Sequence, residues 1–301
     1  MKFGINTFLF ASPFTTRQAP RLFDTFKRWG FDSVEIPIED VSHIDPTRVK
    51  AELEQRGLVC GSVCAVVGPG RDLRGTPKEQ EDSLAYMTQV LDQMMALDCP
   101  TLVGPVYSSV GRADAVPGAE YRRQWKTVVN HLKTLCSRAE ERGKVICLEP
   151  LNRFETDFIN TVEQGLQMIA DVKSPALKLH LDTFHMNIEE KNQAAAIRKA
   201  GRHIGHFHAC GSDRGTPGGD HIDWPAIAQA LRSTGYDGEI TIESFTTDVK
   251  VIARAAAIWR RIEPTRDEIA VNGLKFLRRM FAPVPSRSGN ARRSASAARP
   301  V

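Results

Sequence analysis

Residues 141–149, Glu-Arg-Gly-Lys-Val-Ile-Cys-Leu-Glu, contain the end of a polar helix, a glycine, a short apolar strand and an acid. A glycine just past a helix supplies the left-handed backbone conformation that stops the helix. The same order of helix, glycine and apolar strand recurs around Gly30, Gly57 and Gly235. The fold is therefore predicted to be built from repeated units of a strand followed by a helix.

Eight such units can be placed along the chain. Apolar strands are predicted to begin near residues 2, 33, 58, 101, 145, 177, 203 and 239, and helical patterns follow near 17, 46, 78, 120, 161, 190, 224 and 252. Leu22, Phe26 and Trp29 share one helical face, and Thr161 with Gln164 forms a capping box. Eight units in about 280 residues are typical of a closed (β/α)8 barrel. A doubly wound open sheet is the alternative, but similar unit lengths without a domain break favour closure.

The sequence thus predicts an α/β protein with a single (β/α)8 TIM barrel over residues 1–282. Residues 283–301 are rich in Ser, Ala and Arg and contain four arginines and no acid. We predict that they form a disordered basic tail, since they cannot bury enough apolar surface. The formal net charge of the chain is +4, so the charge of the body without this tail is zero. A neutral body offers no broad field for phosphates, and we expect no nucleic-acid partner.

The composition of the 301 residues, 42% hydrophobic and 25% charged, is that of a soluble globular protein. It excludes a disordered chain, a collagen and a coiled coil. No stretch of 18 unbroken apolar residues is present, so we expect no membrane span. Asn6 interrupts the apolar start, which argues against a signal peptide. Six scattered cysteines without a C-x-x-C pair indicate reduced thiols and a cytoplasmic location.

Four consecutive predicted strands end in a polar side chain. In a parallel barrel the carboxyl ends of the strands form one rim, where functional residues lie. Strands five to eight end at Glu149, Asp182, His208 and Glu243, so these side chains should meet. A single acid there is more often an ion-pair partner or a helix cap, and a lone histidine, His206 or His208, is more often structural. Four such residues at the ends of successive strands favour a functional role over these structural ones.

Three carboxylates in a partly dry pocket are unfavourable unless a positive charge compensates them. A divalent cation provides that charge. Three oxygen donors and one nitrogen suit Mn²⁺, Co²⁺ or Mg²⁺ better than Zn²⁺, which favours thiolates. The sequence therefore predicts one divalent metal ion per subunit at these four residues.

Two longer motifs resemble the ketose 3-epimerase family, which belongs to the xylose-isomerase-like barrels and includes D-tagatose, D-psicose (D-allulose) and L-ribulose 3-epimerases. They are Leu-Glu-Pro-Leu-Asn-Arg-Phe-Glu at 148–155 and His-Leu-Asp-Thr-Phe-His-Met-Asn-Ile-Glu-Glu at 180–190. Ser-Asp-Arg-Gly-Thr-Pro-Gly at 212–218 and Glu-Ser-Phe at 243–245 are similar to the family as well. The resemblance covers residues 1–281.

The resemblance implies a metal, usually Mn²⁺ or Co²⁺, held by the four rim residues, with His208 rather than His206 as the imidazole ligand. It also implies that Glu155, His185 and Arg214 contact the first two oxygens of a small-molecule sugar. A homodimer or homotetramer is the usual assembly of such relatives. Each substrate contact has an ordinary alternative: Glu155 could cap the next segment, His185 could be a plain first-turn helix residue, and Arg214 could be a solvated loop residue.

Epimerisation of a ketose at C3 removes the proton alpha to the C2 carbonyl and returns it on the opposite face. A metal on the sugar oxygens would stabilise the resulting enediolate by several kcal/mol, as an order of magnitude. Glu149 and Glu243 come from different strands, so they could serve as the two bases on opposite faces. Arg214 and His185 would orient the sugar and polarise its carbonyl.

Departures from the family pattern leave the identity of the preferred ketose open. Asn6 stands where many members have an aromatic residue, Tyr107 lies in a loop where some have Trp, and residues 63–70 differ as well. Three other functions remain at this stage. One is another sugar isomerase of this barrel, of hydroxypyruvate, aldose–ketose or inosose type. An apurinic-site endonuclease would carry more histidines for several Zn²⁺ ions. A non-catalytic sugar-binding protein would not need two facing glutamates.

Overall fold

Eight parallel strands form a closed barrel in the computed structural model, which describes residues 1–282. The order around the barrel is the order in the sequence, and the last strand pairs with the first through Lys2 and Glu239. The predicted single TIM barrel is thus confirmed, and the open sheet is excluded. The strands are β1 (Lys2–Asn6), β2 (Ser33–Ile38), β3 (Val59–Ala65), β4 (Thr101–Gly104), β5 (Val145–Leu148), β6 (Leu177–Asp182), β7 (Ile204–Ala209) and β8 (Glu239–Ile242).

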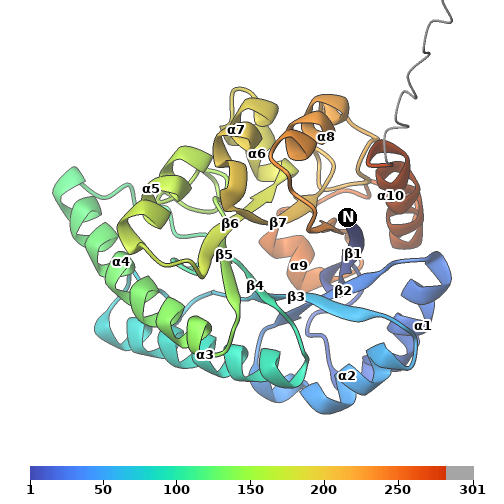
Figure 1. Ribbon diagram of the computed structural model, residues 1–301, viewed down its shortest axis with the longest axis horizontal. Coiled ribbons are helices and arrows are strands. Elements are labelled where there is room, and N and C mark those ends of the chain that lie inside the picture. Colours follow the sequence, from blue (N-terminus) through green and yellow to red (C-terminus); the bar gives the residue numbers. More distant parts are fainter. Residues whose placement is uncertain (283–301) are drawn as a thin grey trace, which may run out of the picture.

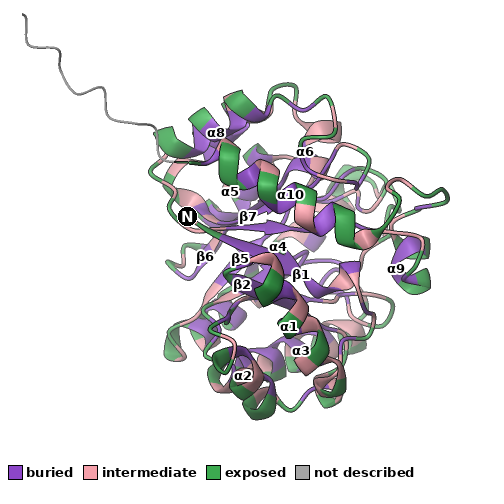
Figure 2. Cartoon of the chain, turned by 90° about the vertical axis from the view of Figure 1, so that its right-hand side faces the viewer, coloured by how far each residue is buried: buried purple, intermediate pink, exposed green. Residues whose placement is uncertain are grey.

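Helices surround the barrel, with their outer faces exposed and the strands buried at the centre (Figures 1 and 2). They are α1 (Ala19–Trp29), α2 (Pro46–Glu54), α3 (Pro77–Ala96), α4 (Gly118–Glu141), α5 (Val162–Val172), α6 (Thr183–Glu189), α7 (Gln193–Ala200), α8 (Trp224–Ser233), α9 (Lys250–Ala255) and α10 (Arg266–Met280). The predicted tail, 283–301, lies outside the described residues. None of the helices in the described part has the length and apolarity needed to cross a bilayer.

The glycines singled out in the sequence end their helices as predicted. Gly30 has a φ of 93°, and its N–H donates to the carbonyls of Phe26 and Lys27. Gly143, two residues after α4, has a φ of 62°. The capping box of Thr161 and Gln164 at the start of α5 is also present. These local signals set where each helix turns back toward the barrel.

Two predicted helices are placed differently in the structure. Where one helix was expected near 190, the structure has two, α6 and α7. α6 starts directly after β6, because the Asp182 side chain accepts a hydrogen bond from Phe184 N. α7 follows and is capped by Asn192. The helix expected near 252 is α9, and it packs in a separate small apolar cluster with Phe245. The eighth helix of the ring is instead α10, which packs against β1 and β8.

The interior of the barrel beneath the carboxyl rim is polar. Barrel interiors are usually filled by branched aliphatic side chains. Here the buried polar residues contributed by the strands include Asn6, Glu35, Ser62, His180, Asp182, His206, His208 and Thr241, each at most 2% exposed. Since buried polar groups are costly unless they are paired, this region is built for something other than packing.

Candidate metal and sugar site

The carboxyl ends of β5 to β8 bring four predicted ligands together. Glu149 and Glu243 extend their strands, because their backbone N–H groups donate to Gly104 O and Ala209 O of the neighbouring strands. Asp182 and His208 are direct partners in the β6–β7 ladder. One ligand atom from each of Glu149, Asp182, His208 and Glu243 lies within 4.8 Å of all the others, and all four residues are buried.

The donor set fits a divalent cation. His208 Nδ1 and Glu149 Oε1 are buried and have no hydrogen-bond partner within residues 1–282. His208 Nδ1 lies 3.4 Å from Glu243 Oε2 and 4.0 Å from Asp182 Oδ2, so one ion could contact all three atoms. Oxygen-rich sets with one imidazole suit Mn²⁺, Co²⁺ or Mg²⁺. The group could therefore hold one metal ion, and that it does so stays a prediction.

The three carboxyls of the cluster are buried close together, and their pKa values shift in different directions. Burial and the neighbouring Glu243 raise the pKa of Glu149 well above its usual range. Burial also raises the pKa of Asp182, against the opposing effect of Arg214. Burial alone would raise the pKa of Glu243, but His208 and Arg214 outweigh it and lower that pKa. A bound dication would lower the pKa values of all three carboxyls.

Arg214 reaches into the cluster from the loop after β7. Its Nη1 donates to Asp182 Oδ2 at 2.7 Å and to Glu243 Oε2 at 3.1 Å. The guanidinium lies between two aromatic rings, 4.1 Å from the centroid of Phe184 and 4.9 Å from that of Phe245. Its backbone φ of 67° lies in the left-handed region, which is unfavourable for a residue with a side chain. Arg214 is thus a buried, positioned cation rather than a solvated loop residue.

His185 projects from α6 beside Arg214 and Glu149. Its Nδ1 accepts from Asn152 N at 3.0 Å, while its Nε2 lies 3.0 Å from Arg214 Nη2 and 3.7 Å from Glu149 Oε1. Burial, with Arg214 nearby, lowers the pKa of His185 well below its usual range. A neutral imidazole has one donor and one acceptor nitrogen. Because Nδ1 accepts from a backbone N–H, the neutral ring would carry its proton on Nε2, and the 3.0 Å contact with the donor Arg214 Nη2 is then not a hydrogen bond.

Glu155 is joined to the site through Asn152. Asn152 Nδ2 donates to Glu155 Oε1 at 2.7 Å and also lies 3.0 Å from His185 Nδ1. Burial raises the pKa of Glu155, and Arg214 opposes that shift. All seven predicted site residues therefore belong to one connected cluster of side chains.

The structure adds residues that sequence reasoning missed. Asn152 lies within the motif at 148–155, so its position there was the available signal. His180 Nδ1 lies 3.5 Å from Glu149 Oε2, and burial with the neighbouring His208 lowers the pKa of His180 well below its usual range. Glu35 was signalled only as a single acid in the otherwise uncharged strand 33–38. Burial alone would raise the pKa of Glu35, but His208 and His206 hold it well below its usual range.

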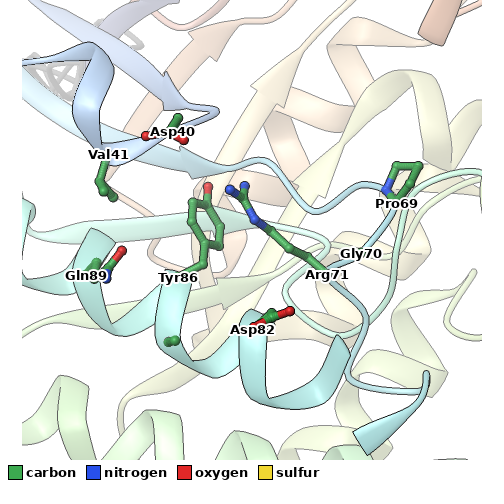
Figure 3. Close-up of a pocket in the computed structure, with 9 residues that line it drawn as sticks. Asp40, Val41, Pro69, Gly70, Arg71, Asp82, Tyr86 and Gln89 are labelled. Carbon is green, nitrogen blue, oxygen red and sulfur yellow. The ribbon is translucent and has the colours of Figure 1, made fainter. Parts of the chain in front are cut away.

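A separate pocket of about 330 Å³ lies among the segments that follow β2 and β3 (Figure 3). In it the Arg71 guanidinium lies 3.9 Å from the Tyr86 ring centroid, and Arg71 Nη1 donates to Glu39 O at 2.8 Å. None of the seven predicted site residues lines this pocket. We therefore assign Arg71 and Tyr86 to the packing of these two segments.

Comparisons with known proteins identify the family to which this barrel belongs. The model of the xylose isomerase-like TIM barrel family matches residues 23–280. A probable ketose 3-epimerase of Synechocystis sp. is 35% identical over 93% of this chain and 97% of its own. A D-psicose 3-epimerase of Ruminiclostridium cellulolyticum is 32% identical over 79% of this chain and 82% of its own.

A solved structure is similar in three dimensions as well. The D-allulose 3-epimerase of Methylomonas sp., in complex with D-allulose, superposes with a TM-score of 0.87 at 28% identity, covering 93% of this chain and 97% of that one. The likeness extends over nearly the whole barrel, so it includes the strands that carry the cluster. The chain therefore belongs to the xylose isomerase-like TIM-barrel family and, within it, to the ketose 3-epimerases, which are enzymes of the isomerase class.

Proposed function

We propose that this protein is a divalent-metal-dependent epimerase that inverts C3 of free ketoses. The candidate pairs are D-tagatose with D-sorbose, D-fructose with D-psicose, and L-ribulose with L-xylulose. The observation that carries the proposal is the convergence of Glu149, Asp182, His208 and Glu243, with one ligand atom from each within 4.8 Å of the others. The names of the relatives, which are epimerases of D-psicose and D-allulose, support the same class of substrate.

The metal proposed for this site is Mn²⁺ or Co²⁺, with Glu149, Asp182, His208 and Glu243 as its ligands. When bound, such an ion supplies Lewis-acid stabilisation of the negative charge that develops on the sugar oxygens. Glu149 Oε1 and His208 Nδ1 are buried and have no hydrogen-bond partner among residues 1–282, which supports this assignment.

The two glutamates would move the proton at C3. One carboxylate removes the proton alpha to the C2 carbonyl, and the other carboxyl returns a proton to the opposite face. The environments of Glu149 and Glu243 shift their pKa values in opposite directions, upward for Glu149 and downward for Glu243. Before a metal binds, the two carboxyls therefore differ in how readily they hold a proton, as an acid and a base must. Reversal of the reaction exchanges the two roles.

The remaining three residues would orient the sugar. His185 Nε2–H and the Arg214 guanidinium are donors for the oxygens on C1 and C2, and both are held by contacts on their far sides. Glu155, hydrogen-bonded to Asn152, is an acceptor for a sugar hydroxyl. Fixing these two oxygens would place C3, rather than C1, between the glutamates.

The test is a panel of free ketoses incubated with the protein and Mn²⁺, with products separated by chromatography. D-fructose, D-psicose, D-tagatose, D-sorbose and L-ribulose are the substrates. We expect at least one of them to yield its C3 epimer with the carbonyl retained at C2. An aldose as the product would favour an aldose–ketose isomerase instead, and no conversion of any ketose would contradict the proposal.

A further inference from the structure

The carboxylate of Glu35 lies beneath the metal-ligand cluster and is completely buried. It is the middle residue of a row across three strands, because Asn6 of β1 and Ser62 of β3 are its direct partners in the two ladders. Asn6 Nδ2 donates to Glu35 Oε1 at 2.7 Å, and Ser62 Oγ donates to Oε2 at 2.5 Å. The strand register therefore fixes this side chain from both sides.

Two histidines of β7 complete the surroundings of Glu35. His208 Nε2 lies 2.9 Å from Glu35 Oε1, and His206 Nε2 lies 3.0 Å from Oε2. Each carboxylate oxygen thus faces two nitrogen or hydroxyl groups. Burial of an ionised carboxylate is unfavourable unless its neighbours donate hydrogen bonds to it. Glu35 can therefore stay ionised only if these four partners each present a proton to it.

The contact with His208 has a consequence for the opposite ring nitrogen. With a metal ion at Nδ1, the ring proton belongs on Nε2, where the Glu35 carboxylate can accept it and so stabilises this tautomer. Nδ1 is the nitrogen that faces Asp182 and Glu243. A histidine ligand needs this arrangement, because a metal binds the unprotonated nitrogen.

Asn6 links Glu35 to a second predicted metal ligand, Glu243. Its amide nitrogen donates to Glu35 Oε1 and also, at 3.0 Å, to Glu243 Oε1. Its carbonyl oxygen accepts from Phe8 N at 2.8 Å, so the amide cannot flip without losing that bond. The one NH₂ group therefore ties Glu35 to Glu243 and leaves Glu243 Oε2 on the side of His208.

We propose that Glu35 is a positioning residue that sets metal affinity by orienting His208 directly and Glu243 through Asn6. This inference rests on the proposed function, since it takes His208 and Glu243 as metal ligands. It also explains why His206 is separated from the ligand cluster: its Nε2 contacts the second oxygen of Glu35. Carboxylate partners of histidine ligands typically contribute a factor of about 10 to 100 in metal affinity.

The test compares Mn²⁺ affinity in Glu35→Gln with that of the wild type, measured by titration of the free Mn²⁺ electron paramagnetic resonance signal. The substitution keeps the size of the side chain and removes its charge. We expect the dissociation constant to rise about 10- to 100-fold. Glu239→Gln is the matched control, because Glu239 is a barrel glutamate bonded to Ser33 and Thr241 and not to the cluster. Its dissociation constant should stay within about twofold of wild type, inside the usual scatter for distant sites.

A second variant covers the case in which Glu35→Gln does not fold, as judged by circular dichroism. Asn6→Ala removes one donor from Glu35 and one from Glu243, and we expect it to weaken Mn²⁺ binding as well. A folded Glu35→Gln with wild-type affinity would overturn the inference. If Glu35→Gln does not fold, a folded Asn6→Ala with wild-type affinity would overturn it instead. The wild type could bind Mn²⁺ tightly, with binding weakened in these variants, and yet epimerise no ketose. That result would support the inference and refute the proposed function. A wild type without Mn²⁺ affinity would overturn both.

Discussion

At the scale of the residue, Glu149 and Glu243 differ although they share one cluster. Glu149 Oε1 lacks a hydrogen-bond partner in the described chain, whereas Glu243 is bonded to Asn6 and Arg214. Each carboxyl is thus held in a different environment, as a pair of groups with complementary acid and base roles requires. This difference supports the two-base mechanism proposed above.

Conversion of either glutamate to glutamine should abolish turnover. Glu149→Gln and Glu243→Gln each keep the size of the side chain but cannot take up or release a proton, so we expect ketose epimerisation to fall by at least about 10²-fold. Initial rates with saturating Mn²⁺ measure the effect, and far-UV circular dichroism checks the fold. Near-normal rates in either variant would refute the two-base assignment.

At the scale of the element, helix caps explain both what could be predicted and what could not. The glycines after α1 and α4 and the capping box of α5 act within one helical turn, so their residues are visible in the sequence. The helix after β6 was expected to begin near 190 but begins at Thr183, because the predicted ligand Asp182 also caps it by accepting from Phe184 N. α10 rather than α9 completes the ring, since the ring position is decided by contact with β1 and β8.

Removal of the α5 cap should weaken the fold measurably. Thr161 Oγ1 accepts from Gln164 N, and Gln164 Oε1 accepts from Thr161 N. We expect Thr161→Ala to lower the free energy of unfolding by about 1 kcal/mol, because an N–H at the start of the helix loses its partner. Urea unfolding followed by circular dichroism measures this change. Thr161→Ser keeps the hydroxyl and serves as control; an equal loss in both variants would show that the cap is not the cause.

At the scale of the whole molecule, the sequence could predict the barrel and the convergence of its rim residues. The carboxyl ends of parallel strands share one rim whatever the loops do, so Glu149, Asp182, His208 and Glu243 had to come close. The role of Glu35 could not be predicted, because its partners come from β1, β3 and β7 and depend on the register of the barrel. Asn6, which looked like a departure from the family, proves to be part of the same row.

Metal should couple to the stability of the whole barrel. The cluster joins the last four strands, so an ion bound there stabilises the folded state relative to the unfolded chain. At a free Mn²⁺ concentration of about 100 times the dissociation constant, the gain is about 2.7 kcal/mol. We expect EDTA to lower the melting temperature and abolish activity, and Mn²⁺ or Co²⁺ to restore both. Full activity in protein proven free of metal would contradict the proposed site.

The central claim, proton exchange at C3 by two carboxylates, is tested most directly by turnover in D₂O. The measurement is ¹H NMR of the ketose and its product after partial conversion with the Mn²⁺-loaded protein. We predict deuterium at C3 of the product, with C1 unlabelled and the carbonyl still at C2. Deuterium at C1 instead, or a C3 epimer formed without any label from solvent, would contradict it.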